Sequence, residues 1–459
     1  MFRGPGAVRT RTISADVDCL FTRPDPDDSS KPQTLVACDG LLCPLKGAAA
    51  LASGAGSFAL EEPLALYLDK SSPWASLEVG GLSECVYDSW SASSYFKLGR
   101  AVVRLLGDGM SPVAGHPNEA GHADGPGPIA RFSNTYVGQM ASDGAGNLFL
   151  ADGPHVRRIQ LPAAWRAAPA PATPATAPAP AKRGEAGHSG SDGDSARGGG
   201  SRIEAAAAAL AGCRIAGDVE APDAEGQEGG SWGGEVAQVS TLPPCLPGED
   251  TAVHSVAFVP AAANARGGAG GGPAAGDTAG ASAAAGTGWL VLGTQTALYR
   301  LRLPLPLALE PPAAPSPGGS SATAPSAAPP SLPSPPPSLP RPQLFAGREG
   351  QRAIRDGARP QARFWNVLGM TVDAAGRLYL MDRPNRGGGC LRCVSPPDDS
   401  SSSSSNSGGG VVATLLTCLP LYGSLPAILP GGWLAVCDGV ERQLVLLDLG
   451  LQPPPLTST

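Results

Sequence analysis

The chain has few charges, few aromatic side chains and no long apolar run. Of its 459 residues, 16% are charged and 5% are aromatic, and the formal net charge is −7. A chain without an overall excess of Lys and Arg has no general attraction for nucleic acid or an anionic membrane. No stretch approaches the roughly 18 apolar residues of a transmembrane helix; the most apolar one, 419–436, is interrupted by prolines. We expect no membrane span and no nucleic-acid partner.

The N-terminus lacks the apolar core of a secretory signal and carries Arg3, Arg9 and Arg11 before the first acid, Asp16. Two interpretations remain, a short organelle transit peptide and an ordinary first strand. Ten cysteines over so long a chain do not form a dense disulfide framework. Their low density favours an intracellular protein with reduced thiols, while the compartment itself stays unknown.

The common catalytic motifs are also missing. The sequence contains no nucleophile elbow, phosphate loop, dinucleotide fingerprint or HExxH. Cys390 and Cys393 form a single CxxC pair without further zinc ligands nearby, and residues three apart on a strand face opposite sides. We therefore predict no catalytic residue, no metal ligand and no cofactor.

Glycine and proline, at 62 and 49 residues, are abundant and divide the chain into short apolar runs. In 121–161, GHADGPGPIARFSNTYVGQMASDGAGNLFLADGPHVRRIQL, a Gly/Pro loop precedes three such runs split by tight turns. Gly and Asn supply the positive φ of hairpin turns, so this spacing predicts an antiparallel meander. The pattern returns at 356–394, where Asp356, Arg363, Phe364 and Asp382 match residues of the first copy. Close recurrence at a distance is typical of a repeat architecture.

Both copies resemble the NHL repeat, which combines a DGxxxxARF loop with a hairpin ending in Asp, although both lack the proline that usually follows. The resemblance implies an all-β fold, a six-bladed β-propeller of four-stranded antiparallel blades. The expected strands are Asp16–Thr22, Thr34–Cys38 and Leu41–Leu45; Leu77–Val79, Cys85–Tyr87, Tyr95–Leu98 and Ala101–Leu106; Val137–Ala141, Leu148–Ala151, Val156–Leu161 and Val236–Leu242; Val253–Val259, Trp289–Leu292, Ala297–Leu303 and Leu344–Phe345; Val367–Val372, Leu378–Met381, Cys390–Val394 and Val411–Leu416; Ala427–Leu429, Trp433–Cys437 and Gln443–Leu449. The last group lacks an outer strand, and we predict that Val8–Ile13 supplies it and closes the ring.

The domain is expected to span 8–449 as one propeller that acts as a monomer, followed by a tail at 450–459. Its low-complexity insertions are 163–234, 261–287, 304–342 and 395–409, which are rich in Ala, Gly, Pro and Ser. Such segments hold too few large apolar groups to offset the entropy of ordering, so we expect them to be disordered. Within the first, 201–215 is alanine-rich enough for a short helix.

The insertions, together with a polar stretch at Arg23–Gln33, all fall between the first and second or the third and fourth strands of a blade. In an up-and-down meander these connections lie on one side of the ring. The opposite side then keeps compact loops, and we predict that it binds the ligand or partner. The alternative is that surface loops tolerate insertions anywhere.

Two groups of polar residues are candidates for a site. Asp39, Asp88, Asp152, Asp382 and Asp438 end second strands; they form either a ring of carboxylates for a cation or, as we favour, acceptors for the turn amides that follow them. Asp124, Asp356, Asn134 and Asn366 are expected to fix loops. From 343 to 394 there are nine arginines and four acids. Arginine suits carboxylate and phosphate partners, and the predicted binding residues are Arg348, Arg352, Arg355, Asp382 and Arg386, whereas Arg363, which matches Arg131, is expected to be structural.

Three functions follow. The favoured one is a non-catalytic NHL-type propeller that binds a protein partner, as a scaffold, through the face opposite the insertions. The second is an enzyme similar to calcium-dependent lactonases or lyases with six-bladed folds, for which calcium would be the cofactor. The third is RNA binding through a basic face, as in some NHL proteins.

Overall fold

In a computed structural model of the chain, the described residues are 9–12, 17–38, 41–48, 58–68, 82–133, 138–168, 235–242, 246, 251–261, 287–303, 341–384, 388–396, 410–419, 425–438 and 443–453. The chain divides into two units, Met1–Ala167 with Gly230–Thr459, and Ala168–Gly229. The description that follows concerns the first unit.

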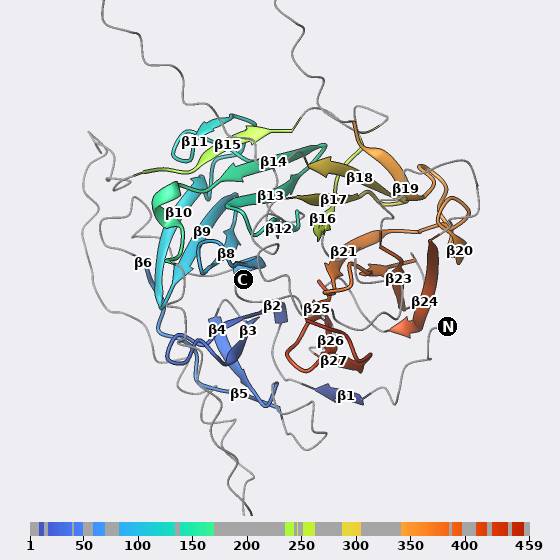
Figure 1. The fold of residues 1–459 in the computed structure, drawn as a ribbon, viewed down its shortest axis with the longest axis horizontal. Helices are drawn as coiled ribbons and strands as arrows, with labels where there is room; N and C mark the ends of the chain where they lie inside the picture. The colour runs from blue at the N-terminus through green and yellow to red at the C-terminus, as the bar shows by residue number, and fades with distance from the viewer. Residues whose placement is uncertain are drawn as a thin grey trace, which may run out of the picture. The chain divides into compact units, whose positions relative to one another are not determined.

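Six separate β-sheets make up this unit, and in each one strands that follow one another along the chain pair side by side (Figure 1). Blade 1 contains β2 (Val17–Pro24), β3 (Pro32–Cys38), β4 (Leu41–Lys46) and β5 (Ala59–Leu60); blade 2 contains β7 (Leu82–Asp88), β8 (Ser93–Leu98), β9 (Ala101–Leu106), β10 (Gly109–Gly115) and β6 (Tyr67–Leu68). Blade 3 contains β12 (Met140–Ser142), β13 (Asn147–Asp152), β14 (His155–Gln160), β15 (Gln238–Thr241) and β11 (Gly125–Pro126); blade 4 contains β16 (Ser255–Pro260), β17 (Gly288–Gly293), β18 (Ala297–Leu303) and β19 (Gln343–Gly347). Blade 5 contains β21 (Val367–Val372), β22 (Leu378–Asp382), β23 (Gly389–Val394), β24 (Val411–Leu419) and β20 (Gly357–Ala358); blade 6 contains β25 (Ala427–Ile428), β26 (Trp433–Asp438), β27 (Gln443–Asp448) and β1 (Arg9–Thr12).

The innermost strands β2, β7, β12, β16, β21 and β25 contact one another in this order, and β25 returns to β2. Six apolar clusters fill the spaces between neighbouring sheets. Successive side chains of a strand point to opposite faces, so Leu35 packs with Phe96 of blade 2 while Val36 packs with Leu446 of blade 6. The predicted all-β, six-bladed propeller is confirmed.

Ring closure joins the two ends of the described chain. β1 pairs antiparallel with β27, from Arg9 opposite Leu446 to Thr12 opposite Gln443. An N-terminal strand therefore completes a blade whose other three strands come from the C-terminal end. This pairing confirms the prediction made for Val8–Ile13.

In blade 2 each predicted strand lies one strand closer to the centre of the ring than we expected. Cys85–Tyr87 belong to the innermost strand β7, and the sequence GMSPVAG, which we expected to be loop, forms the outer strand β10. β10 pairs with β6 at Gly109 and Met110, and its register with β9 is irregular between Pro112 and Ala114. A bulge of this kind tolerates a proline, which cannot donate a hydrogen bond. The predicted first strand, Leu77–Val79, lies outside the described residues.

In the other blades the predicted strands are confirmed to within a few residues at their ends. The two-residue strands β5, β11 and β20 were not predicted. β5 pairs with β4, and β11 and β20 pair with the outer strands of their own blades, β15 and β24. β11 and β20 come from the Asp-Gly pair that opens each repeat copy. Gly125 and Gly357 have φ values of 125° and 136°, a region that favours glycine, so the motif requires glycine here.

The four predicted insertions fall between β14 and β15, β16 and β17, β18 and β19, and β23 and β24. Because strands alternate in direction, these connections share one side of the ring, which we call the insertion face; the other side is the compact face. Arg23–Gln33 is no real insertion, because β2 and β3 extend to Pro24 and Pro32. The connection from β5 to β7 is also long, and it contributes β6 to the outer side of blade 2. The helix predicted at 201–215 lies outside the described residues.

Ring closure can be tested by deleting residues 1–13. Without β1, the edge of β27 is exposed, so we expect a clearly lower melting temperature and concentration-dependent association. Thermal melting and light scattering measure both effects. Deletion of residues 398–408, inside an insertion, is the matched control and should change neither the melting temperature nor the association. If both deletion variants melt at the same temperature as the parent, the result would contradict ring closure by β1.

Candidate functional site

The first repeat copy builds a buried clamp around Arg157 on β14. Its guanidinium donates to Asp152 Oδ2 at 3.0 Å and to Asp124 Oδ1 at 2.8 Å, as well as to the carbonyls of Ala123 and Arg131. Asp124 in turn accepts hydrogen bonds from the backbone N–H and the hydroxyl of Thr241 on β15. The crossover loop from blade 2 is thereby joined to three strands of blade 3.

The second copy repeats this clamp around Arg392 on β23. Arg392 donates to Asp382 Oδ2 at 2.8 Å, to Asp356 Oδ1 at 2.9 Å and to the carbonyls of Arg355 and Arg363. Asp356 accepts from the N–H and hydroxyl of Thr414. Arg392 also lies over the ring of Phe364, as Arg157 lies over Phe132, at 4.8 and 5.2 Å from the centroids.

The aspartates that end the second strands of blades 3 and 5 bind the crossovers that precede these strands, whereas we predicted bonds to the turns that follow. Asp152 accepts from the N–H and hydroxyl of Ser133, and Asp382 accepts from the N–H groups of Trp365 and Asn366, all in the preceding crossover. Burial of Asp382 raises its pKa, while the amides and Arg392 act in the opposite direction.

The remaining aspartates divide differently. Asp88 ends an innermost strand rather than a second strand, but it accepts from the N–H and hydroxyl of Ser91 in the turn that follows, as predicted. Asp124 and Asp356 fix their loops as predicted. Asp39, Asn134 and the side chain of Asp438 are outside the described residues.

The predicted binding residues occupy different environments. Arg348, Arg352 and Arg355 are exposed on the crossover loop that leaves blade 4. Asp382 is 0% exposed and is occupied by the clamp, so it is not placed to meet a ligand. Arg386 lies outside the described residues. Arg363 donates to Gln351 and to the carbonyls of Pro360 and Ala362, which matches the bonds of Arg131.

A further carboxylate, Glu349, anchors the crossover loop that carries these arginines. It accepts hydrogen bonds from Thr294 and Thr296 in the turn between β17 and β18, at 2.9 and 3.2 Å, and from the hydroxyl of Tyr299 at 3.2 Å. Arg352 adds a hydrogen bond to Gln295 in the same turn. The first half of the loop is thus tied to blade 4 while the second half is tied to blade 5.

Sequence reasoning missed Arg157, Arg392 and Glu349. Arg157 follows its aspartate closely, whereas Gly-rich residues separate Arg392 from Asp382, so a fixed spacing does not reveal the pair. Strand register does reveal it: Arg157 lies opposite Leu150, and Arg392 lies opposite Leu380 at the equivalent position. Glu349 has no counterpart in the other copy and gives no sequence signal.

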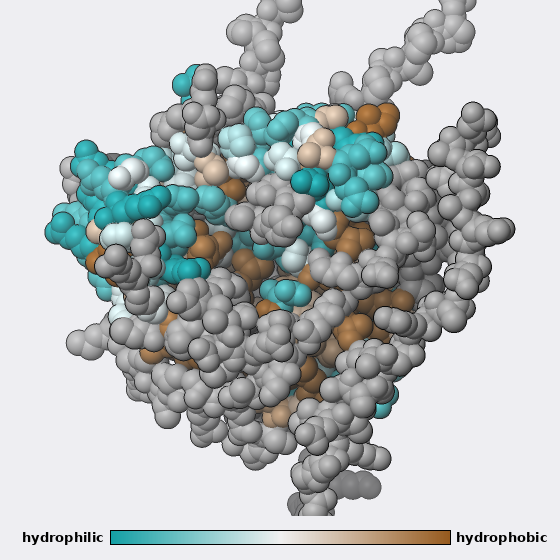
Figure 2. All heavy atoms as spheres, turned by 180° about the vertical axis from the view of Figure 1, so that it is seen from behind, coloured by the Kyte–Doolittle hydropathy of each residue, from teal (hydrophilic) through white to brown (hydrophobic). Residues whose placement is uncertain are grey.

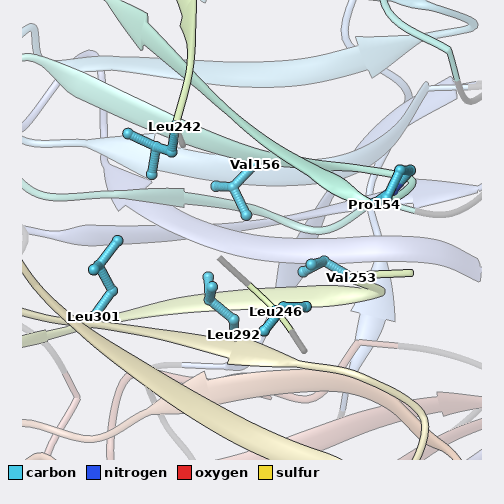
Figure 3. Close-up of a pocket in the computed structure, with 7 residues that line it drawn as sticks. All are labelled: Pro154, Val156, Leu242, Leu246, Val253, Leu292 and Leu301. Atoms are coloured by element: carbon cyan, nitrogen blue, oxygen red, sulfur yellow. The ribbon is translucent and has the colours of Figure 1, made fainter. Parts of the chain in front are cut away.

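A small apolar pocket lies between blades 3 and 4 (Figure 3). Its lining is aliphatic apart from Pro154, and its volume of about 10 Å³ has room for one water molecule at most. It is therefore a packing defect rather than a ligand site. In the described part of the chain, no three Asp, Glu, His or Cys side chains are grouped to hold a metal ion, and no helix is long and apolar enough to cross a bilayer.

The innermost strand of blade 2 contains a strained acidic residue. Glu84 has a φ of 50° at a register irregularity in β7, and its Oε2 is buried without a hydrogen-bond partner. Burial raises the pKa of Glu84 to about 7, although the nearby Lys97 ammonium acts in the opposite direction. Burial likewise lowers the pKa of Lys97, which is 3% exposed. Unfavourable backbone conformations and shifted carboxylates of this kind gather at functional sites.

No protein-family model matches the chain, and no curated protein matches it. Among solved structures, an auxiliary nutrient binding protein from Bacteroides thetaiotaomicron is 9% identical, with a TM-score of 0.42 over 94% of this chain and 69% of that one. A structural genomics protein of unknown function from the same organism is 9% identical, with a TM-score of 0.25 over 96% and 100% of the two chains. Similarities this weak do not bear on function, and the class of this protein, a six-bladed β-propeller, is defined by its own strand topology.

The clamp predicts a large effect of Arg392→Met on stability. Removing the guanidinium leaves the buried carboxylate of Asp382 without its cation, which costs about 3–5 kcal/mol. Arg131→Met is the control: Arg131 pairs with Glu119, and both side chains are partly exposed, so its loss costs about 1 kcal/mol or less. Urea denaturation measures both, and Arg392→Met with Asp382→Asn should recover part of the loss. Equal effects of the two arginine variants would contradict a structural clamp.

The raised pKa of Glu84 predicts a pH-dependent gain for Glu84→Gln. A folded-state pKa of about 7, above the usual 4.5, means that the neutral form is favoured by folding below pH 4.5 and that this contribution is lost as pH rises through 7. The variant should match the parent at pH 4.5 and exceed it by up to about 3 kcal/mol at pH 8. Glu62→Gln, at an exposed position, should show no such trend in denaturation midpoints. A pH-independent difference for Glu84→Gln would show that this carboxyl titrates normally.

Proposed function

We propose that the chain is a non-catalytic NHL-type propeller that binds a protein partner through its compact face, as a single chain and without a cofactor. The observation that carries the proposal is the crossover 348–366, which hydrogen bonds fix at both ends. Glu349 holds its start to blade 4 and Arg392 holds its remainder to blade 5, while Arg348, Arg352 and Arg355 are exposed.

Rigid presentation of exposed side chains supports a binding role. Ordering a mobile loop on binding has an entropic cost that lowers the affinity, whereas a loop that is already fixed in the free protein does not have this cost. Arg is also enriched among the residues that dominate protein interfaces. The membership of the NHL family and the scaffold role are part of this proposal, and the two clamps, which use the residues of the repeat motif, support them.

The proposal is tested by comparing two kinds of variant. Arg348→Glu with Arg355→Glu reverses the charge of the compact-face loop, and deletion of 312–338 shortens an insertion. Immobilised protein is used to capture partners from cells of the native source, and captured proteins are quantified by mass spectrometry. We expect the charge reversal to reduce capture of a defined set of proteins at least tenfold, because exposed arginines dominate the contact, and the deletion to retain the set.

Melting temperatures of both variants should equal that of the parent, which controls for misfolding. The opposite pattern, capture unaffected by charge reversal but lost on deletion of 312–338, would assign binding to the insertion face and contradict the proposal.

A further inference from the structure

Arginine and aromatic side chains alternate across blade 4 toward blade 5. Arg302 and Arg300 of β18 lie over the ring of Trp289 on β17, at 5.7 and 4.5 Å from its centroid. Arg300 also reaches Phe345 of β19 at 5.9 Å, and Arg359 lies over the same ring at 4.6 Å. Stacking on a ring fixes a guanidinium, and Arg300 and Arg359 also donate hydrogen bonds to Gln343 and to the carbonyl of Pro396. The three guanidinium groups are thereby held in place before any ligand arrives.

These side chains extend the basic loop into a larger surface on the outer edge of blades 4 and 5, where β19 and β20 lie (Figure 1). We call it the arginine rim, and it consists of Arg300, Arg302, Arg341, Arg348, Arg352, Arg355 and Arg359. Figure 2 shows hydrophilic residues gathered on this edge of the ring. All rim arginines except Arg300 and Arg359 are exposed, and those two are partly buried.

The rim has a strong local charge. Stretches 288–303 and 341–363 contain eight arginines, two acids and no lysine, in a chain of net charge −7. Both acids are occupied within the fold, Glu349 by Thr294, Thr296 and Tyr299 and Asp356 by Arg392 and Thr414. A local positive field on a negative protein selects and orients an oppositely charged partner.

Exposed apolar side chains accompany the arginines. Leu344 on β19 is 51% exposed, Ile354 in the crossover 38% and Val411 on β24 43%. Elsewhere in the described chain only Leu106 and Ile129 are large, apolar and comparably exposed. Arginine beside apolar groups is the composition of a protein interface rather than of a purely electrostatic contact.

The rings of the rim argue against single-stranded RNA. Such RNA is bound by stacking bases on exposed aromatic side chains, but Trp289 and Phe345 are only 8% and 5% exposed and are already covered by guanidinium groups. Bidentate arginine forks match carboxylates well without any ring.

We infer that the arginine rim binds an acidic segment of a protein partner, whose Glu or Asp carboxylates meet the arginines and whose apolar side chains meet Leu344 and Ile354. The inference rests on the proposed function and names the chemistry of its partner. It also enlarges the docking surface from the compact face along the outer edge of the ring to the insertion-face ends of β18 and β19, where Arg302 and Arg341 lie.

The test uses the full chain and three fluorescent probes: a 16-residue peptide of four Glu-Glu-Leu-Glu repeats, the same peptide with Gln in place of Glu, and a 16-nucleotide poly-U RNA. The rim variant is Arg302→Glu with Arg341→Glu and Arg348→Glu. Its matched control is Lys31→Glu with Lys46→Glu and Arg166→Glu, which changes the charge equally at exposed positions of blades 1 and 3.

We expect the Glu peptide to bind the parent protein at low salt, with an affinity that falls as the salt concentration rises. Its affinity for the rim variant should be at least tenfold lower than for the parent, and its affinity for the control variant should be within threefold of the parent. The Gln peptide and the RNA should bind at least tenfold more weakly than the Glu peptide. Equal loss in both variants would show a general charge effect and overturn the inference, as would tighter binding of RNA. If the Glu peptide does not bind but Arg348→Glu with Arg355→Glu still abolishes partner capture, the acidic partner is excluded and the proposed function stands. If the Glu peptide does not bind and these substitutions leave partner capture unchanged, the inference and the proposed function are both wrong.

Discussion

The antiparallel pairing of β1 with β27 is the contact on which the rest of the ring depends. Each sheet packs against its two neighbours through one apolar cluster on either side. The pairing joins chain ends more than four hundred residues apart, and a closed ring has no unpaired edge blade. A side-chain contact across the middle adds to this closure: Gln139, before β12, bonds both backbone polar groups of Met370 on β21.

Local patterns predicted most of the fold because a meander is built from neighbouring segments. Hairpin turns and short apolar runs located most strands of five blades, and the missing outer strand of the last blade identified β1. The prediction of blade 2 failed because Gly109–Gly115 contains proline and glycine, which normally indicate a loop. The site was harder to predict. Arg392, Asp356 and Thr414 meet through strand register, and Trp289, Arg300 and Arg359 come from segments separated by an insertion, so no local pattern joins them.

Comparison of the two repeat copies separates structure from binding. Residues that the copies share, such as Asp124 and Asp356 or Arg131 and Arg363, make equivalent internal hydrogen bonds. By the same alignment, Arg348, Arg352 and Arg355 stand where the first copy has His116, Ala120 and Ala123. The carbonyls of Ala123 and Arg355 make the same bond to the clamp arginine, so the backbone is kept while the exposed side chain changes. Blade 5 therefore adds a basic surface to a structural frame that blade 3 also has.

The central claim is that this fixed, basic loop is where the protein meets its partner. Hydrogen–deuterium exchange of the full chain, with and without the Glu-Glu-Leu-Glu peptide, tests it most directly, since bound backbone amides exchange more slowly. The account predicts slower exchange in 341–363 and no change in the insertion-face turns 373–376 and 430–432. Protection of those turns with none in 341–363 would contradict it.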